Sequence, residues 1–363
     1  MRAAVLQAVG DETVEVRDDV EVVGPGPGEV RVAIRATGVC HSDLSAMNGT
    51  IPQPTPAVLG HEGAGEVVAV GEGVGTIKLG DHVIVVWVPP CGTCRYCLGG
   101  QPNLCTQVMY AAGLTPRFVV GGSPAYGFAG TGTFAEEVVL PVQGVVAIDK
   151  DVPWEIASLL GCGVVTGVGA AINAAKIRPG SSVLVYGCGG VGMAVIQGAR
   201  IAGAAEIVAV DRVEAKLDQA RRFGATHAVV PERLGGPKDE ITEGDGFDYA
   251  FEVIGRPETI RAAYDNVRRG GTAVVVGAGR AEETVELNAF ELFYSEKTLK
   301  GTIYGSADVR TDFHRLLRLW KAGRLDLEGM ISDRLDLSKI NEAFAKMRAG
   351  EAIRQVIHFG GAA

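Results

Sequence analysis

The segment SVLVYGCGGVG, from Ser182 to Gly192, decides how the second half of the chain folds. Its first five residues are mostly apolar and β-branched, as in a buried strand, and a helical pattern continues to Ala202. Between them lies the pattern G-x-G-x-x-G: Gly187, Cys188, Gly189, Gly190, Val191 and Gly192. Such glycines permit a tight turn and let backbone N–H groups at the helix N-terminus approach a pyrophosphate. We therefore predict a dinucleotide-binding loop, with a Gly-rich turn that binds nothing as the alternative.

Strands and helices alternate on both sides of this loop. A helical pattern at 166–175 is followed by strands at 182–187, 206–211, 248–254 and 271–277, with helices at 191–202, 213–223 and 258–267 between them. This alternation is typical of a parallel sheet with helices on both faces. Together with the loop it predicts an α/β fold with a doubly wound parallel sheet of the Rossmann type.

The remaining sequence predicts a second, β-rich domain. Short β-branched runs between residues 31 and 88 are bounded by Gly, Pro or Asp, as strands of a mostly antiparallel unit would be. Helical patterns at 312–323 and 341–348 and a strand at 354–359 end the chain. We expect residues 1–163 and 304–363 to form the β-rich domain and 164–303 the dinucleotide-binding domain.

Asp211 closes the strand after the loop, about twenty residues beyond it. A carboxylate there accepts hydrogen bonds from both adenosine ribose hydroxyls and repels a 2′-phosphate. The cofactor is therefore predicted to be NAD rather than NADP, a preference that the neighbouring Arg212 tempers. A capping or surface Asp is the alternative for this position.

Four cysteines lie within fifteen residues, at Cys91, Cys94, Cys97 and Cys105. Four thiolates make a closed tetrahedral site with no position for substrate, so the spacing predicts a structural zinc ion. An iron-sulfur cluster is the main alternative, and buried free thiols or disulfides are others. Nothing else in the sequence indicates electron transfer.

Length and composition limit the classes of protein. With 363 residues two domains are expected, and a composition of 47% hydrophobic and 21% charged residues argues against disorder, collagen-like structure and coiled coils. The net charge of −9, without basic clusters, makes nucleic acid and anionic membranes poor partners. We see no signal-peptide core and no run of about 18 apolar residues, so a cytoplasmic protein is expected.

Cys40, His61 and Cys162 stand apart from the cysteine cluster, and each alone is as typical of a buried structural residue as of a ligand. Their surroundings are more specific: GVCHSD at 38–43, GHEGAG at 60–65 and GCGVVTGVG at 161–169. With the cysteine cluster, the loop, Asp211 and the closing Ile353-Arg354, these motifs resemble the zinc-containing alcohol dehydrogenases of the medium-chain dehydrogenase/reductase family. The resemblance covers essentially the whole chain and implies a GroES-like β-rich catalytic domain.

The resemblance implies a second, catalytic zinc, so that two Zn²⁺ ions are expected per chain. Cys40, His61 and Cys162 would bind it, leaving a position for water or the alcohol oxygen. Glu62 would lie behind the metal, or else pair with a nearby Arg. Asp43 would take the ring N–H of His61, or else cap a helix.

The resemblance also implies cofactor and substrate residues. Thr166 and Val191 would pack the nicotinamide, Arg354 and His41 would face phosphate, and Val276 would contact the cofactor. Trp87 and Ile51 would line the substrate channel. Ser42 would take the departing proton, but the His that ends this relay in well-known relatives is here Ser45. We therefore expect protons to leave through the cofactor ribose to water or to His41.

The expected function is NAD-linked interconversion of primary aliphatic or aromatic alcohols and aldehydes by a homodimer. A formaldehyde dehydrogenase dependent on mycothiol or glutathione is the closest alternative, with Arg117 as a candidate cation at the pocket mouth. A zinc-free enoyl or quinone reductase, or an NAD(P)H-binding structural protein, is the alternative of another class. The cysteines and His61 would have no role in such proteins.

Overall fold

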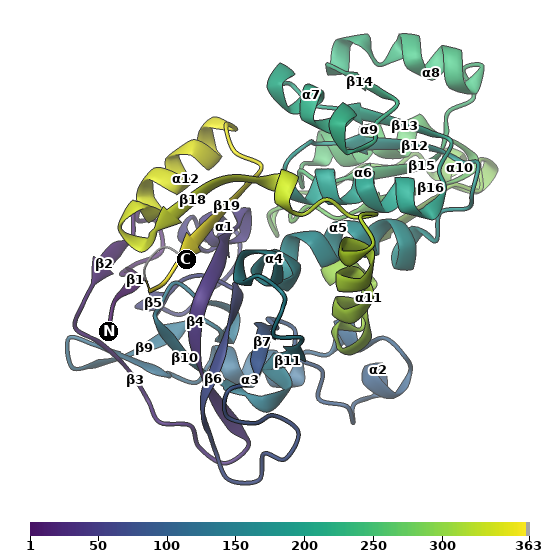
Figure 1. Cartoon of the computed structure of the whole chain (residues 1–363). Coiled ribbons are helices and arrows are strands. Elements are labelled where there is room, and N and C mark those ends of the chain that lie inside the picture. The colour runs from purple at the N-terminus through teal and green to yellow at the C-terminus, as the bar shows by residue number, and fades with distance from the viewer. Residues whose placement is uncertain (361–363) are drawn as a thin grey trace. The chain divides into compact units, whose positions relative to one another are not determined.

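A computed structural model describes residues 1–360 and divides into two compact units (Figure 1). Of the described residues, the first comprises Met1–Cys162, Asp308–Arg318 and 327–360. The second comprises Gly163–Ala307 and Leu319–Asp326. This division differs from the sequence-based boundaries chiefly in placing Leu319–Asp326, which begins in the last turn of helix α11 (Val309–Lys321), with the second unit.

The second unit contains a six-stranded sheet in which every neighbouring pair is parallel. Its order is β14 (His227–Val229), β13 (Glu206–Val210), β12 (Ser182–Tyr186), β15 (Phe247–Glu252), β16 (Val267–Val275) and β17 (Thr298–Gly301). The accompanying helices are α6 (Gly190–Ala202), α7 (Glu214–Phe223), α8 (Gly235–Thr242), α9 (Pro257–Asn266) and α10 (Ala289–Tyr294). The order reverses beside β12, which is the Rossmann topology, and proteins with this topology bind ligands at the carboxyl ends of the strands at that point. The predicted fold class is confirmed.

The first unit is β-rich. One sheet has the order β2 (Glu15–Arg17), β1 (Ala3–Leu6), β5 (Ala57–Val58), β9 (Ser123–Gly127), β8 (Phe118–Val120) and β3 (Val20–Val22). The other has the order β11 (Val145–Ile148), β7 (His82–Val85), β6 (Glu62–Val70), β4 (Glu29–Val39), β19 (Arg354–His358) and β18 (Ile331–Asp336), with β10 (Glu137–Pro141) also on β4. Helices α1 (His41–Met47), α2 (Arg95–Leu98), α3 (Gln107–Gly113) and α12 (Ile340–Ala349) complete it. The last strand, β19, is antiparallel to β4, so residues 355–358 lie beside residues 36–39.

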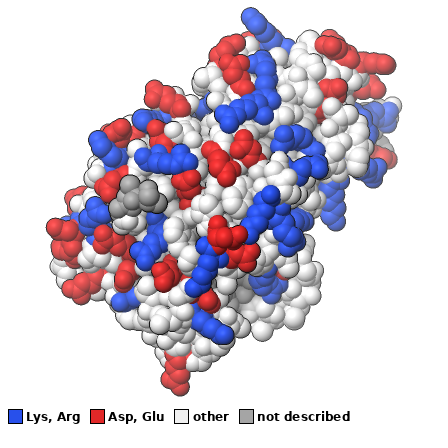
Figure 2. Space-filling view, in the orientation of Figure 1, with Lys and Arg blue, Asp and Glu red and all other residues white. Residues whose placement is uncertain are grey.

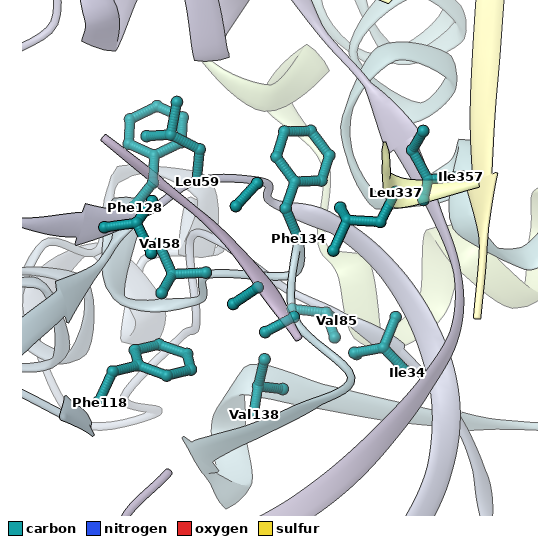
Figure 3. Close-up of a cluster of buried hydrophobic side chains, with 14 of the residues drawn as sticks. Ile34, Val58, Leu59, Val85, Phe118, Phe128, Phe134, Val138, Leu337 and Ile357 are labelled. Carbon is teal, nitrogen blue, oxygen red and sulfur yellow. The ribbon is translucent and has the colours of Figure 1, made fainter. Parts of the chain in front are cut away.

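One apolar core joins the sheets of the first unit (Figure 3). Its members come from strands and loops far apart in the sequence: Ile34, Val58, Leu59, Val85, Phe118, Phe128, Phe134, Val138, Leu337 and Ile357. All are nearly inaccessible to solvent. Burying one large apolar side chain stabilises a fold by about 1.5–3 kcal/mol. This core therefore holds the loops around it in place.

A helix from Trp154 to Ala175 links the units and is longer than the predicted helix at 166–175. It consists of α4 (Trp154–Leu159), a π-helical segment (Leu160–Val164), α5 (Val165–Gly169) and a second π-helical segment (Ala170–Ala175). Its 22 residues are long and apolar enough to span a membrane, but 83% of its most apolar window is buried within the protein, as in a core helix. Cys162 lies in the first π-helical segment.

Charged side chains of both signs are interspersed over the face of the molecule in Figure 2. Among the described residues, exposed side chains form ion pairs such as that of Arg221 with Asp218 at 2.7 Å. Exposed pairs of this kind stabilise a fold by at most about 1 kcal/mol each, so the core is the main source of stability.

Candidate active site and metal centres

Four predicted site residues meet in the first unit: Cys40, His61, Glu62 and Cys162. Each offers one ligand atom, and all four atoms lie within 4.8 Å of one another. All four side chains are buried. Three segments therefore meet at one point. They are the residue before α1, the start of β6 and the π-helical segment that contains Cys162. A set of two thiols, an imidazole and a carboxylate suits a zinc ion.

Glycines bring these segments together. Gly60 has φ +88°, and a Cβ there would lie 2.6 Å from the backbone N of Phe134. A Cβ on Gly161 would lie 3.1 Å from the Cα of Glu62, so Gly161 lets the helix that carries Cys162 approach β6. Side chains at these positions would push the ligands apart.

Asp43 orients two of the ligands from a fully buried position. Its Oδ1 accepts hydrogen bonds from the N–H of Gly60 (3.0 Å) and from Nδ1 of His61 (3.2 Å). Its Oδ2 accepts from the N–H of Cys40 at 3.1 Å, at the start of α1. Asp43 thus caps a helix and also contacts His61, the two roles that the sequence left open. When Nδ1 donates to Asp43, Nε2 of His61 presents its lone pair.

Nε2 of His61 is buried and has no hydrogen-bond partner among residues 1–360. Burial acts to lower the pKa of His61, but the charges of Asp43 and Cys40 outweigh it and raise the pKa to about 10. A hydrogen bond with Cys162 lowers the pKa of Cys40 well below its ordinary value, against burial. The cluster therefore attracts a cation, either a proton on His61 or a metal ion that replaces it. The donor set fits zinc.

Glu62 forms a buried ion pair with Arg354 of β19. The pair lies over Gly38 of β4, where an added Cβ would collide with both side chains. Removing one partner of a buried pair typically costs about 3–5 kcal/mol because the other charge is left unpaired. Glu62 is thus both a member of the ligand cluster and the partner of an Arg. A contact of Arg354 with pyrophosphate remains a prediction.

Two aromatic rings flank His61. Trp87 meets it edge-on with ring centroids 6.3 Å apart, and Phe128 meets it at 5.2 Å with the planes at 90°. Sequence reasoning missed Phe128, because residues 109–132 carry no recognisable pattern. Ile51 is half-buried against the apolar core of the first unit. The surroundings of His61 therefore combine two aromatic rings with Asp43 and the other ligand residues.

The remaining predicted residues of this site lie on α1. Ser42 is half-buried, with Oγ 3.8 Å from Sγ of Cys40. His41 is exposed at the start of the helix. Ser45 is half-buried, and its carbonyl accepts a hydrogen bond from the N–H of Ile51 at 2.9 Å. Ser42 is thus the hydroxyl placed beside the ligand cluster.

The other four cysteines form a separate cluster, with all four Sγ atoms within 4.8 Å of one another. Backbone N–H groups point at the sulfurs, from Cys94 to Cys91 at 3.2 Å and from Cys91 to Cys105 at 3.3 Å. The N–H and hydroxyl of Thr93 lower the pKa of Cys91 to about 6, which favours the thiolate. Zn–S bonds of about 2.3 Å in a tetrahedron separate sulfurs by about 3.8 Å. The spacing fits one ion better than a cluster whose cysteines bind separate iron atoms.

In the second unit the phosphate loop has the geometry that its glycines predict. Gly187 has φ +97°, and a Cβ on Gly192 would collide with the carbonyl of Gly187. A Cβ on Gly189 would meet no atom within 4 Å, so the backbone there borders open space. Oδ2 of Asp211 accepts the N–H of Cys188 at 2.8 Å. The loop thus offers a close approach at Gly189 to a ligand at the N-terminus of α6.

Thr166 and Val191, the predicted nicotinamide contacts, lie on helices α5 and α6. These helices touch, because a Cβ on Gly167 would lie 2.4 Å from the carbonyl of Val191. The hydroxyl of Thr166 is buried and makes no hydrogen bond within the described part of the chain. Val276 follows β16 and is half-buried, and Arg212 is exposed. A free buried hydroxyl beside the loop suits a ligand with an amide.

Comparison with known proteins defines the family. Residues 26–150 match the alcohol dehydrogenase GroES-like domain, and residues 190–322 match the zinc-binding dehydrogenase domain. Together these two matches cover most of the chain. The chain belongs to the zinc-containing medium-chain dehydrogenase/reductase family. The family inferred from the motifs is therefore confirmed.

Relatives of this dehydrogenase match over nearly their whole lengths. It is 41% identical to a Mycobacterium tuberculosis protein provisionally named alcohol dehydrogenase D, over 93% of this chain and 95% of the relative. It is 40% identical to S-(hydroxymethyl)glutathione dehydrogenase of Escherichia coli, over 99% of each. The solved structure of benzyl alcohol dehydrogenase from Acinetobacter calcoaceticus has a TM-score of 0.91 and 32% identity over 99% of both chains. This chain is therefore a dehydrogenase of the zinc-binding class.

Proposed function

We propose that this dehydrogenase interconverts primary aliphatic or aromatic alcohols and their aldehydes with NAD and two Zn²⁺ ions per chain. The observation that carries the proposal is the convergence of Cys40, His61 and Cys162 beside two aromatic rings. With the carboxylate of Glu62 paired to Arg354, the three other protein ligands leave a position for substrate, and the two aromatic rings favour the carbon skeleton of an alcohol. A zinc-free reductase gives these residues no role.

When bound, zinc supplies a Lewis acid that favours ionisation of an alcohol hydroxyl, and NAD accepts the hydride. Asp43 fixes the ring and tautomer of His61 through its Oδ1. Glu62, paired with Arg354, keeps a buried negative charge next to the ligands without leaving it uncompensated. Trp87 and Phe128 orient the substrate and exclude water from beside His61.

Ser42 takes the proton of the alcohol hydroxyl. Its Oγ lies beside Cys40, and a hydroxyl can accept one proton while it donates its own. Because Ser45 cannot hold a proton near pH 7, water or the exposed His41 would receive the proton after Ser42, and the ribose hydroxyls of a bound cofactor would supply the link between them. Ser42 thus relays the proton but does not store it.

Asp211 and the apolar residues near it support NAD as the cofactor. The carboxylate of Asp211 follows β13 at the carboxyl edge of the sheet, where the adenosine ribose is expected. Ile254 and Val213 expose 45% and 36% of their surfaces although they are apolar. Such side chains near the phosphate loop suit the flat face of an adenine.

An assay of NAD reduction with a panel of alcohols tests the function. Ethanol, 1-butanol and benzyl alcohol are compared with the adducts of formaldehyde with glutathione and with mycothiol. We expect the simple alcohols to be oxidised with kcat/KM about tenfold or more above that of either adduct, because polar groups of the adducts find no partner beside apolar walls. NADP in parallel tests the cofactor and is expected to be a poorer substrate.

A thiol-dependent formaldehyde dehydrogenase is the second candidate, favoured by the E. coli relative. Arg117, the cation considered for the pocket mouth, is instead paired with Glu29. Both side chains of this pair are mostly buried. That pairing weakens the second candidate, and faster oxidation of either thiol adduct than of every simple alcohol would replace the first candidate by it.

We also propose that this dehydrogenase is a cytoplasmic homodimer. None of the seven cysteines forms a disulfide within residues 1–360, which suits a reducing compartment. Strand β17 ends the Rossmann sheet, and on α10 Phe290 and Phe293 expose 68% and 77% of their surfaces. An open sheet edge next to exposed aromatic rings favours pairing with a second copy. Sedimentation equilibrium is expected to give twice the chain mass, and a monomer at micromolar concentration would contradict this.

A further inference from the structure

Glu252 is a fully buried carboxylate at the carboxyl edge of the Rossmann sheet. It is the last residue of β15 and pairs in register with Tyr186, the residue before Gly187 of the phosphate loop. Neither the glycine-loop pattern nor the position of Asp211 predicts a role for Glu252. Its position places it beside the residue that precedes the predicted dinucleotide-binding loop.

One oxygen of Glu252 fixes the turn after β15. Oε1 accepts three hydrogen bonds, from the N–H of Ile254 (2.9 Å), the N–H of Gly255 (2.7 Å) and the hydroxyl of Thr259 (2.7 Å). The backbone carbonyl of Glu252 accepts from the N–H groups of Val276 (2.8 Å) and Gly277 (3.1 Å). The same residue therefore ties down the turns after β15 and β16. Bonds to an ionised acceptor are among the stronger ones in proteins.

That turn packs directly against the phosphate loop. A Cβ on Gly187 would lie 2.9 Å from side-chain atoms of both Val253 and Ile254. Gly255 has φ +86°, and a Cβ there would lie 2.5 Å from the carbonyl of Ala278. The turns after β15 and β16 thus pack tightly against each other, and the turn after β15 also packs tightly against the phosphate loop. A shift of the turn after β15 would move Gly187.

The second oxygen of Glu252 has a different environment. Oε2 is buried and has no hydrogen-bond partner within residues 1–360. An apolar side chain would avoid the cost of burying this group. A carboxylate kept at such a position is better explained by what its Oε1 organises than by a gain in stability.

We propose that Glu252 is a positioning residue for the dinucleotide. It holds Val253 and Ile254 against Gly187, so that the loop N–H groups stay aimed at the pyrophosphate and Ile254 stays at the site edge. The proposal rests on the proposed function in assuming that a nicotinamide dinucleotide binds this loop. Glu252 itself touches no reacting atom and acts through the turn.

Two conservative variants separate geometry from charge. Glu252→Asp keeps the charge but withdraws the carboxylate by one methylene, so that it cannot reach all three donors. Glu252→Gln loses the charge but keeps an acceptor in place of Oε1. We expect NADH fluorescence titration of the zinc-loaded full chain to give a Kd at least fivefold higher for Glu252→Asp and within threefold of the unchanged chain for Glu252→Gln.

Glu258→Ala is the matched control, because Glu258 is an exposed carboxylate on α9 near the same turn. It is expected to leave the Kd unchanged. If Glu252→Asp does not fold, Thr259→Val removes one of the three donors, and the Kd is expected to rise two- to threefold. Unchanged affinity in the folded variants, or an equal loss in Asp and Gln, would overturn the proposal. NADPH is titrated in parallel. If the protein binds NADPH instead of NADH, the Kd values of the variants can then still be ranked with NADPH.

Discussion

Cys162→Ser is expected to remove one zinc ion per chain and to lower kcat/KM for alcohol oxidation by roughly 10³-fold or more. The reason is that Cys162 belongs to the ligand cluster with Cys40 and His61, and a serine hydroxyl is a poor zinc ligand. Loss of a Lewis acid removes several kcal/mol of transition-state stabilisation, and each 1.36 kcal/mol is tenfold in rate. Elemental analysis and NADH formation measure the two effects on one preparation.

The control for this variant lies one turn earlier on the same helix. Ser158 is buried on α4 and its hydroxyl donates to the carbonyl of Glu155 at 2.9 Å. Ser158→Ala changes the packing of that helix without touching a ligand, so zinc content and kcat/KM should stay within threefold of the unchanged chain. A Cys162→Ser variant that kept its zinc and its activity would remove Cys162 from the metal site.

Cys105→Ser is expected to remove the other zinc ion and to lower the melting temperature by on the order of 10 °C. Cys105 is fully buried and its sulfur accepts the N–H of Cys91. Residues 91–105 hold little regular structure, with α2 only four residues long, so a bound ion would take the place of an apolar core there. Differential scanning calorimetry and elemental analysis measure the effect.

Thr93→Val is the control for the structural site. It removes the hydroxyl that lies 3.6 Å from Sγ of Cys91 but keeps all four thiols and the backbone N–H contacts. Its melting temperature should stay within about 2 °C and its metal content unchanged. Cys105→Ser with full metal content and unchanged melting would show that the four thiols are free.

Local patterns in the sequence were sufficient to predict much of the fold. The strand, glycine loop and helix from Ser182 to Ala202 form a unit whose parts are contiguous, and the structure has β12, the turn and α6 there. The four cysteines between 91 and 105 are likewise close in sequence. Where neighbours in sequence are neighbours in space, spacing alone indicates the contact.

The catalytic cluster could not be found in that way. Cys40, His61 and Cys162 are distant in sequence, and only the resemblance to a family grouped them. Phe128 and Glu252 were missed because their contacts depend on tertiary packing of loops. The first half of the helix that begins at Trp154 was not predicted from the sequence, because glycines such as Gly161 and Gly167 have a low helix propensity. These glycines are retained where Glu62 and Val191 approach the helix closely.

Elemental analysis of the purified chain, with NAD reduction by benzyl alcohol measured on the same sample, tests the central claim most directly. The account predicts two zinc ions per chain and alcohol-dependent NADH formation that is lost when a chelator removes the ion at Cys40, His61 and Cys162. One zinc ion per chain, held only by the four cysteines from 91 to 105, would contradict it.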